Sequence, residues 1–304
     1  MRSSILRRAV AVLASVTTLV AVSPAHAGAS GAGAPSCIVS LSPTATDTLF
    51  AIGAGHQVAA VDKDAALPSR GLPSIRIDAL NPSLEAILSV CRPTAAHPSR
   101  RPDLVVISYD ANKIKERLAA LGVKVLEQDA PTTLAGAFAQ MQALGAATGH
   151  AVAAARLSAS IAATIRRDVA SVPPHAGKTL RVYYEIDPTG YSLTSATFVG
   201  SLLHALGVVN IADAQSTSAD AGYPQLNPEY VVSANPQLIF LDDGVSPSAL
   251  AARPGFAGVA AVTSGHVVVV NQNIGSEWGV RLGNLMNGLT RAVIAAYNDP
   301  SLWG

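Results

Sequence analysis

The sequence predicts an α/β protein made of two lobes, each with a mostly parallel sheet, joined by one long rigid helix. Three observations carry this prediction. Short apolar strand patterns alternate with helix patterns, a stretch at residues 134–171 contains helix patterns only, and the alternation then restarts. Strands that alternate with helices favour a parallel sheet covered on both faces. The chain has 304 residues, 49% of them hydrophobic and 13% charged, which suffices for two cores of ordinary size.

The first lobe is expected at residues 37–133. Its first strand pattern is followed by the capping residue Ser42, and the helix that begins there ends at Gly53. The same rhythm continues along the lobe. Buried strands are predicted at residues 38–41, 58–61, 104–108 and 123–126, and helices at residues 42–53, around Glu85 and at residues 111–121.

A helical linker is expected at residues 134–172. Its first helix ends at Gly149, and its second covers residues 151–171. At 1.5 Å per residue this second helix is roughly 30 Å long, comparable to the diameter of a small domain. It carries one apolar stripe at every fourth position, formed by Leu157, Ile161, Ile165 and Val169. We interpret it as a stiff rod between the lobes; the alternative is an ordinary surface helix of the second lobe.

The second lobe is expected at residues 173–304, after two prolines that end the long helix. Residues 203–207 of this lobe resemble residues 49–53 of the first, which indicates a duplication. Strands are predicted at residues 180–186, 208–211, 238–241 and 267–270, and helices at residues 196–206, around Glu229 and at residues 281–297.

A cassette with one glutamate occurs in both lobes. Each copy has a short amphipathic helix with its Glu, then a proline, then a buried strand. When the inserted residues 91–100 are set aside, Glu85 precedes Pro102 by as many positions as Glu229 precedes Pro236. The repeat predicts one carboxylate in an equivalent place on each lobe. The alternative is that both are solvated residues at helix starts, where the helix dipole favours an acid.

The beginning of the chain has the pattern of a secretory signal peptide. Three arginines precede an apolar stretch at residues 9–22, and Ala25-His26-Ala27 is typical of a cleavage site. We therefore expect an exported protein, periplasmic or otherwise outside the cytoplasm, cleaved near Ala27, with a flexible leader at residues 28–36. Without residues 1–27 the chain has 18 basic and 20 acidic residues, a net charge of −2. This balance argues against a nucleic-acid partner.

Export permits disulfides. The chain has two cysteines, Cys37 before the first strand and Cys91 at the start of the inserted residues 91–100. We expect them to pair and to tether the insertion to the edge of the first lobe; the alternative is two unrelated thiols.

Enzymatic motifs are absent from the sequence. There is no G-x-S-x-G elbow, phosphate-binding loop, C-x-x-C or H-E-x-x-H, and the seven histidines show no metal-ligand spacing. We therefore expect no catalytic residue, no metal site and no cofactor. A Ser/His/Asp triad assembled from distant segments is the alternative.

Ligands of open α/β sheets bind beyond the carboxyl ends of the strands. Exposed aromatic side chains there suit a large, flat, partly apolar ligand, although each could instead anchor its loop. The candidate ligand-binding residues are Ser42, Tyr109, Asp187, Tyr191, Tyr223 and Trp278. The same loops contain Asp62, Asp110, Asp129, Asp187, Asp242 and Asp243, but only Lys63 and Arg281 as cations. This balance favours an uncharged or cationic ligand over a strongly anionic ferric catecholate.

Several motifs together resemble those of a known family. They lie at residues 38–47, 102–107, 121–125, 183–188, 223–226 and 235–239. The chain resembles the substrate-binding proteins of ABC importers for vitamin B12, ferric siderophores and haem, which have the helical-backbone, class III periplasmic-binding fold. Residues 183–188 and 223–226 look most like the B12-binding branch.

The resemblance implies a function. Glu85 and Glu229 would meet arginines on the permease dimer, and a monomeric receptor would capture a corrinoid in the cleft between its lobes. A ferric siderophore or haem is the alternative ligand, and for haem Tyr109 or Tyr191 could serve as the axial ligand. A secreted enzyme or an adhesion module on the same scaffold is the remote alternative. A stiff connecting helix further implies small lobe movements.

Overall fold

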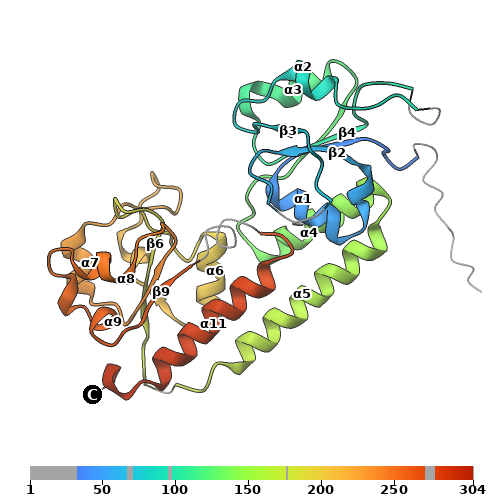
Figure 1. Cartoon of the computed structure of the whole chain (residues 1–304). Coiled ribbons are helices and arrows are strands. Elements are labelled where there is room, and N and C mark those ends of the chain that lie inside the picture. Colours follow the sequence, from blue (N-terminus) through green and yellow to red (C-terminus); the bar gives the residue numbers. More distant parts are fainter. Residues whose placement is uncertain (1–32, 67–70, 95–97, 176, 271–277, 304) are drawn as a thin grey trace, which may run out of the picture. The chain divides into compact units, whose positions relative to one another are not determined.

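The computed structural model describes residues 33–66, 71–94, 98–175, 177–270 and 278–303, and Figure 1 shows two sheets within them. The expected signal peptide at residues 1–27, and residues 28–32 of the leader, lie outside this part. Among the described residues, no helix is both long enough and apolar enough to cross a membrane. The predicted α/β class with parallel sheets is confirmed.

The first sheet has the strand order β3-β2-β1-β4-β5, with every described pair parallel. Its strands are β1 (Ile38–Leu41), β2 (Val58–Asp62), β3 (Arg76–Ile77), β4 (Leu104–Ile107) and β5 (Lys124–Glu127). One face is covered by α1 (Pro43–Ala51), α4 (Leu134–Thr148) and the start of α5 (Ala151–Ser171), and the other by α2 (Leu84–Leu88) and α3 (Ile114–Ala119).

The second sheet has the order β7-β6-β8-β9 and is also parallel. Its strands are β6 (Arg181–Glu185), β7 (Val209–Asn210), β8 (Leu238–Leu241) and β9 (Val267–Val269). One face is covered by α6 (Phe198–Ala205), α11 (Leu282–Asn298), the later part of α5 and the first turns of α4, and the other by α7 (Pro228–Ala234), α8 (Pro247–Ala251) and α9 (Ala260–Thr263). Short 3₁₀ turns lie at Ala54–Gln57, Ala111–Lys113, Ile211–Gln215, Phe256–Gly258 and Pro300–Leu302.

The two lobes repeat one arrangement. The order β2-β1-β4-β5 of the first sheet corresponds to β7-β6-β8-β9 of the second. In each lobe a helix follows the central strand, and that helix is followed by a glycine with positive φ, Gly53 (90°) or Gly207 (75°). The duplication predicted from the glutamate cassettes is therefore visible in the topology.

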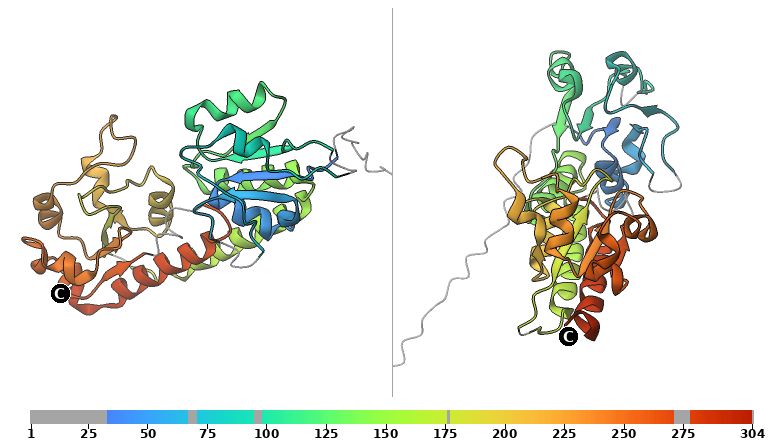
Figure 2. Two further views of the ribbon diagram at one scale, coloured as in Figure 1. Left: turned by 45° about the horizontal axis from the view of Figure 1, so that its top comes forward. Right: turned by 90° about the vertical axis from the view of Figure 1, so that its left-hand side faces the viewer.

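The helix α5 contributes to the cores of both lobes. Ala154 packs into the core of the first lobe, whereas Ile161 and Ile165 pack into the core of the second. Leu157 lies between them and contacts both cores. Figures 1 and 2 show α11 running beside α5, so the connection consists of more than the single helix expected from the sequence.

A second connection joins α11 to the first lobe. Arg281, just before α11, donates hydrogen bonds from Nε (3.0 Å) and Nη2 (2.9 Å) to Oδ2 of Asp47 in α1, and both residues are buried. Gly279 lies so close to α1 that an added Cβ would sit 3.2 Å from the carbonyl oxygen of Thr44. The start of α11 is thus held against the first lobe while its length packs in the second.

Some boundaries differ from the predictions. The helix expected at residues 111–121 begins as α3 only at Ile114, because Asn112 and Lys113 both have φ of 55°. The strand β3 and the helices α8 and α9 were not predicted. The lobe and linker boundaries at residues 133 and 172 stay predictions.

The expected disulfide joins Cys37 to Cys91, with a Cα–Cα distance of 6.0 Å. The backbone N–H of Cys91 also donates to the carbonyl of Arg100 (3.2 Å), which closes the base of the insertion. Residues 95–97 of the insertion lie outside the described residues.

Removal of the disulfide should lower the free energy of unfolding by about 4 kcal/mol, because the bond closes a long loop in the unfolded chain. Urea denaturation of the Cys37→Ser/Cys91→Ser variant, compared with the oxidised and the reduced wild type, measures this. The variant and the reduced wild type should agree. Equal stability of all three would contradict the structural role of the bond.

Candidate functional site

A cavity of about 260 Å³ lies beyond the carboxyl end of β6. It is lined by Ala130, Pro131, Tyr184, Ile186, Leu193, Thr197, Phe198, Val199, Tyr223, Asp242 and Trp278. Two of the predicted ligand-binding residues, Tyr223 and Trp278, are brought together here from segments far apart in sequence. The remaining walls are mostly apolar, with one carboxylate among them.

The indole of Trp278 is held in place by α4. Its Nε1–H donates to Oε1 of Gln140 at 2.7 Å. Gln140 is itself fixed by two further hydrogen bonds. Its side-chain amide donates to the backbone carbonyl of Asp129 (2.6 Å), and its backbone carbonyl accepts from the side chain of Gln128 (2.8 Å). The aromatic wall is therefore ordered before a ligand arrives, which lowers the entropy cost of binding.

Tyr223 is 45% exposed and lies on a segment that pairs with the one carrying Tyr191. The N–H of Ser192 donates to the carbonyl of Pro224 at 2.9 Å. The turn before Tyr223 is closed by Asp220, whose carboxylate accepts several hydrogen bonds. The pKa of Asp220 is lowered, mainly by the hydrogen bond that its carboxylate accepts from the backbone N–H of Thr217.

Asp242 is the acidic group of the cavity. Its Oδ2 accepts a hydrogen bond from the hydroxyl of Tyr184 at 2.9 Å. Burial raises the pKa of Asp242 to about 6, although the Tyr184 hydrogen bond opposes the shift. Burial also raises the pKa of Tyr184, which keeps its hydroxyl protonated as a donor. At neutral pH the cavity thus presents a carboxylate able to accept hydrogen bonds from a ligand.

The other predicted residues lie elsewhere. Tyr109 is 65% exposed, and neither it, Tyr191 nor Asp187 is among the residues lining this cavity. Oδ1 of Asp187 accepts from the N–H (2.7 Å) and hydroxyl (2.6 Å) of Thr189, which closes a local turn.

Ser42 has a structural role at the start of α1. Its side chain is 2% exposed and caps α1 by accepting from the N–H of Ala45 at 3.2 Å. The helix cap accounts for its position, and a contact of Ser42 with a ligand stays a prediction.

The members of the site that sequence reasoning missed include Tyr184, Phe198 and the supporting Gln140. Tyr184 lies within a strand, and Phe198 and Gln140 lie within helices, so the local pattern assigned them to structural positions. The alternation in β6 was the available signal for Tyr184, because Tyr183 and Tyr184 point to opposite faces of the sheet.

Glu85 and Glu229 are both exposed and occupy the second position of their helices. Both helices have a side-chain cap, since Ser83 accepts from the N–H of Ala86 (3.2 Å) and Asn227 from that of Glu229 (2.8 Å). Each helix precedes the corresponding strand of its sheet, β4 or β8. This exposed, matched placement is what a docking role requires.

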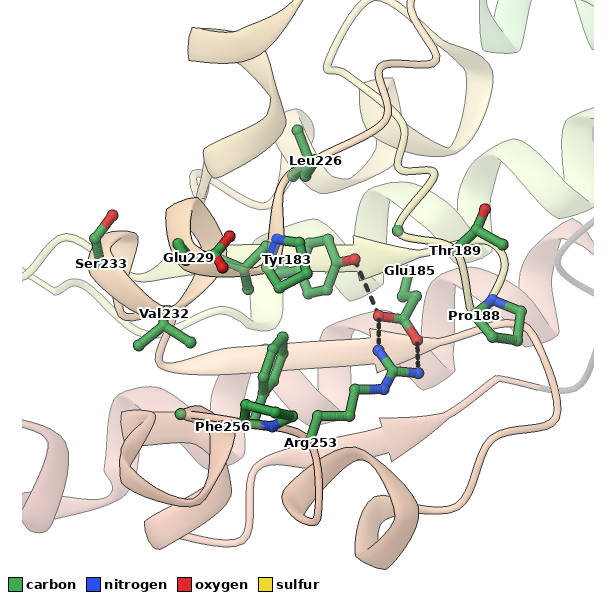
Figure 3. Close-up of a pocket in the computed structure, with 15 residues that line it drawn as sticks. Tyr183, Glu185, Pro188, Thr189, Leu226, Glu229, Val232, Ser233, Arg253 and Phe256 are labelled. Atoms are coloured by element: carbon green, nitrogen blue, oxygen red, sulfur yellow. Dashed lines mark hydrogen bonds and ion pairs between the residues drawn. The ribbon is translucent and has the colours of Figure 1, made fainter.

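A second cavity, of about 610 Å³, lies beside Glu229 on the α7 side of the second sheet. Figure 3 shows Tyr183, Glu185 and Arg253 meeting within it. Both terminal nitrogens of Arg253 donate to the carboxylate of Glu185 at 2.7 Å. Burial raises the pKa of Glu185, and the Arg253 hydrogen bonds oppose the shift.

Comparison with known protein families assigns the chain to one of them. A model described as periplasmic binding protein matches residues 38–274. The chain belongs to the periplasmic binding protein family. The resemblance found in its sequence motifs is thereby confirmed, and the family consists of solute-binding proteins rather than enzymes.

Two relatives give the family context. The chain is 28% identical over 251 residues to a protein of Halobacterium salinarum named cobalamin-binding protein, covering 79% of this chain and 64% of the relative. It therefore spans less than two thirds of that protein. It is 26% identical over 274 residues to a Bacillus subtilis protein named uncharacterized ABC transporter substrate-binding lipoprotein YvrC, covering 87% of this chain and 81% of the relative.

Solved structures support the fold. The periplasmic heme-binding protein RhuT from Roseiflexus has a TM-score of 0.71 and 22% identity, covering 88% of this chain and 100% of that one. The vitamin B12 binding protein BtuF of Vibrio cholerae has a TM-score of 0.69 and 21% identity, with the same coverage. At this level of identity the similarity concerns the fold alone.

The stability of the protein should depend on the protonation of Asp242. Because its pKa in the folded state lies above the unfolded value, stability should rise as the pH falls through about 6 and level off near the unfolded value of about 4. The thermal midpoint of the wild type should therefore gain a few degrees over Asp242→Asn on acidification from neutral pH. Glu116→Gln, in the exposed face of α3, is the matched control. Parallel pH profiles of the wild type and Asp242→Asn would contradict the assignment.

Proposed function

We propose that the chain is an extracytoplasmic solute-binding protein of an ABC importer that captures a corrinoid and delivers it to the permease. The cavity with Trp278, Tyr223 and Asp242 is the observation that carries the ligand proposal. The relative named cobalamin-binding protein supports the same ligand class.

A corrinoid suits this cavity chemically. Its macrocycle is flat and partly apolar, so its edge can lie against Trp278 and Phe198, while its peripheral amides can donate hydrogen bonds to the carboxylate of Asp242. Ligand pockets usually measure about 300–1,000 Å³, so a cavity of about 260 Å³ receives only one part of so bulky a molecule. We propose that Tyr191, which is exposed and lies on the segment that pairs with that of Tyr223, contacts the remainder.

The charges near the cavity favour a corrinoid over the two alternative ligands, haem and a ferric siderophore. The two cations expected at the ligand edge are already engaged, since Lys63 pairs with Asp78 (2.8 Å) and Arg281 with Asp47 (2.9 Å). The carboxylate of Asp242 opposes the propionates of haem and the oxygens of a ferric catecholate. A ligand with neutral amides avoids this repulsion.

Delivery is proposed to use the two matched glutamates. Glu85 and Glu229 would contact arginines of the permease, one from each lobe. Because α5 packs into both cores, ligand capture should require small lobe movements rather than a wide closure. No step of this function needs a catalytic residue.

Ligand identity can be read from Trp278 fluorescence. The chain has two tryptophans, and Trp303 stacks on Tyr297 with centroids 5.7 Å apart, so Trp303→Phe leaves Trp278 as the reporter. Cobalamin should quench this variant with saturation at low micromolar concentration or below, whereas Trp278→Phe should show no specific quenching. Free tryptophan corrects for absorbance by the ligand.

Haemin and a ferric hydroxamate are titrated in parallel. Saturation with one of these and not with cobalamin would replace the corrinoid by that ligand. Saturation with none of the three would refute the proposed ligand class.

Reversal of both docking charges should separate transport from binding. In cells with this chain as the sole receptor, Glu85→Arg/Glu229→Arg should reduce cobalamin uptake by about tenfold or more, because like charges would face the permease arginines. The affinity measured by fluorescence should stay within about twofold of the wild type. Glu116→Arg is the control for charge reversal at an exposed site. A parallel loss of affinity would show that the glutamates belong to the ligand site.

A further inference from the structure

The cavity beside Glu229 takes no part in the ligand site described above. Its walls are largely apolar and come from the segment before α7, from α7 itself and from the segment after α8 (Figure 3). Among the lining residues Leu226, Val231 and Phe256 are buried beneath the cavity, whereas Pro228, Val232 and Pro254 are accessible at its walls. At about 610 Å³ it can hold a large apolar side chain together with neighbouring backbone.

The polar base of this cavity is a hydrogen-bonded cluster of Glu185, Arg253 and Tyr183. Glu185 is fully buried, and the guanidinium of Arg253 binds its two carboxylate oxygens at 2.7 Å each. The hydroxyl of Tyr183 donates a third hydrogen bond at 3.0 Å. The guanidinium carbon also lies 5.8 Å from the ring centroid of Phe256. Because Arg253 already makes a two-point hydrogen bond to Glu185, an uncharged apolar guest suits this base better than a second anion.

The rim carries a negative charge. Glu229 lines the cavity from the first turn of α7, and it is exposed. Within the part of the chain that the structure describes, the Glu229 carboxylate forms no ion pair. An apolar recess with an unpaired carboxylate at its edge is complementary to an apolar side chain that has a cationic neighbour.

We propose that this cavity is a docking socket for a segment of the permease in which a large apolar side chain is next to an arginine or lysine. The proposal rests on the docking role proposed for Glu229 and adds to it. The cation pairs with Glu229 at the rim, while the apolar side chain fills the recess over Phe256 and Val232. The charge sets the register of the contact, and burial of the apolar side chain supplies most of its affinity.

Blocked dipeptides test the socket without the permease. The probes are N-acetyl-Phe-Arg-amide, N-acetyl-Phe-Glu-amide and N-acetyl-Ala-Arg-amide, titrated into the isotope-labelled mature chain and followed by amide chemical shifts. The Phe-Arg probe should shift Val232, Ser233, Gly255 and Phe256 with millimolar affinity. It should bind about two- to fivefold more tightly than the Phe-Glu probe, as expected for one exposed ion pair. The Ala-Arg probe should cause little shift.

Three variants sharpen the test. Ser233→Trp places a ring at the cavity wall and should abolish the shifts, whereas Ala249→Trp, on the exposed surface of α8 outside the cavity, should not. Glu229→Gln should remove the preference for Phe-Arg over Phe-Glu. Circular dichroism checks that each variant is folded. Absence of shifts, shifts that survive Ser233→Trp, or equal binding of the two Phe probes would each overturn the proposal.

The same variants separate this inference from the proposed function. Ser233→Trp should reduce uptake with unchanged cobalamin affinity, and Ala249→Trp should reduce neither. If Glu229→Arg leaves uptake intact, the docking role of Glu229 fails and the assignment of the socket to the permease fails with it, even where the wild type binds the Phe-Arg probe. If Glu229→Arg blocks uptake but Ser233→Trp does not, the docking role stands and the socket is refuted.

Discussion

The apolar stripe of α5 is the constraint on which the two-lobe arrangement depends. Ala154 is buried in one core, Ile161 and Ile165 in the other, and Leu157 touches both. A displacement of either lobe along this helix would expose apolar surface at about 25 cal/mol per Å². Gly145 of α4 brings the helices together, since an added Cβ there would lie 2.4 Å from that of Ala154. The position of the candidate ligand-binding loops is therefore set by helix packing.

The segment before α11 transmits this constraint to the candidate site. Arg281 is anchored on Asp47 of the first lobe, and Trp278 is anchored on Gln140 of α4. Breaking a buried ion pair by removing one partner generally costs about 3–5 kcal/mol, so this anchor is not easily released. Because α11 itself packs in the second lobe, the aromatic wall of the cavity is held by both halves of the molecule. This anchoring supports the proposal that a ligand binds to a fixed surface rather than through a large closure.

Regular periodicity made much of the fold predictable from the sequence. The candidate site was harder to predict, because contacts between distant segments form it. The four-residue spacing of the α5 stripe and the continuous apolar runs of β4 and β8 specify those elements locally. The two-residue strand Arg76–Ile77 is too short to show a repeating pattern of apolar residues. The left-handed backbone at Asn112 cannot be predicted from helix propensity. Ser42 follows a strand, as ligand residues do, but the same position is a helix cap. Gln140 and Phe198 join the site only through tertiary packing.

Both lobes contain the glutamate cassette, but they differ at the last residue of the strand that pairs with the cassette strand. Pairing register makes Leu41 of β1, opposite Ile107, equivalent to Glu185 of β6, opposite Leu241. Leu41 packs in an apolar core, whereas Glu185 needs Arg253 and Tyr183 to balance its charge. Replacing an apolar residue by a buried ion pair rarely increases stability, because desolvation offsets the attraction. Core stability alone therefore does not account for Glu185. The pair instead fixes Arg253 against Phe256 and shapes the recess next to Glu229, which gives the second lobe a contact surface that a repeated carboxylate alone would not provide.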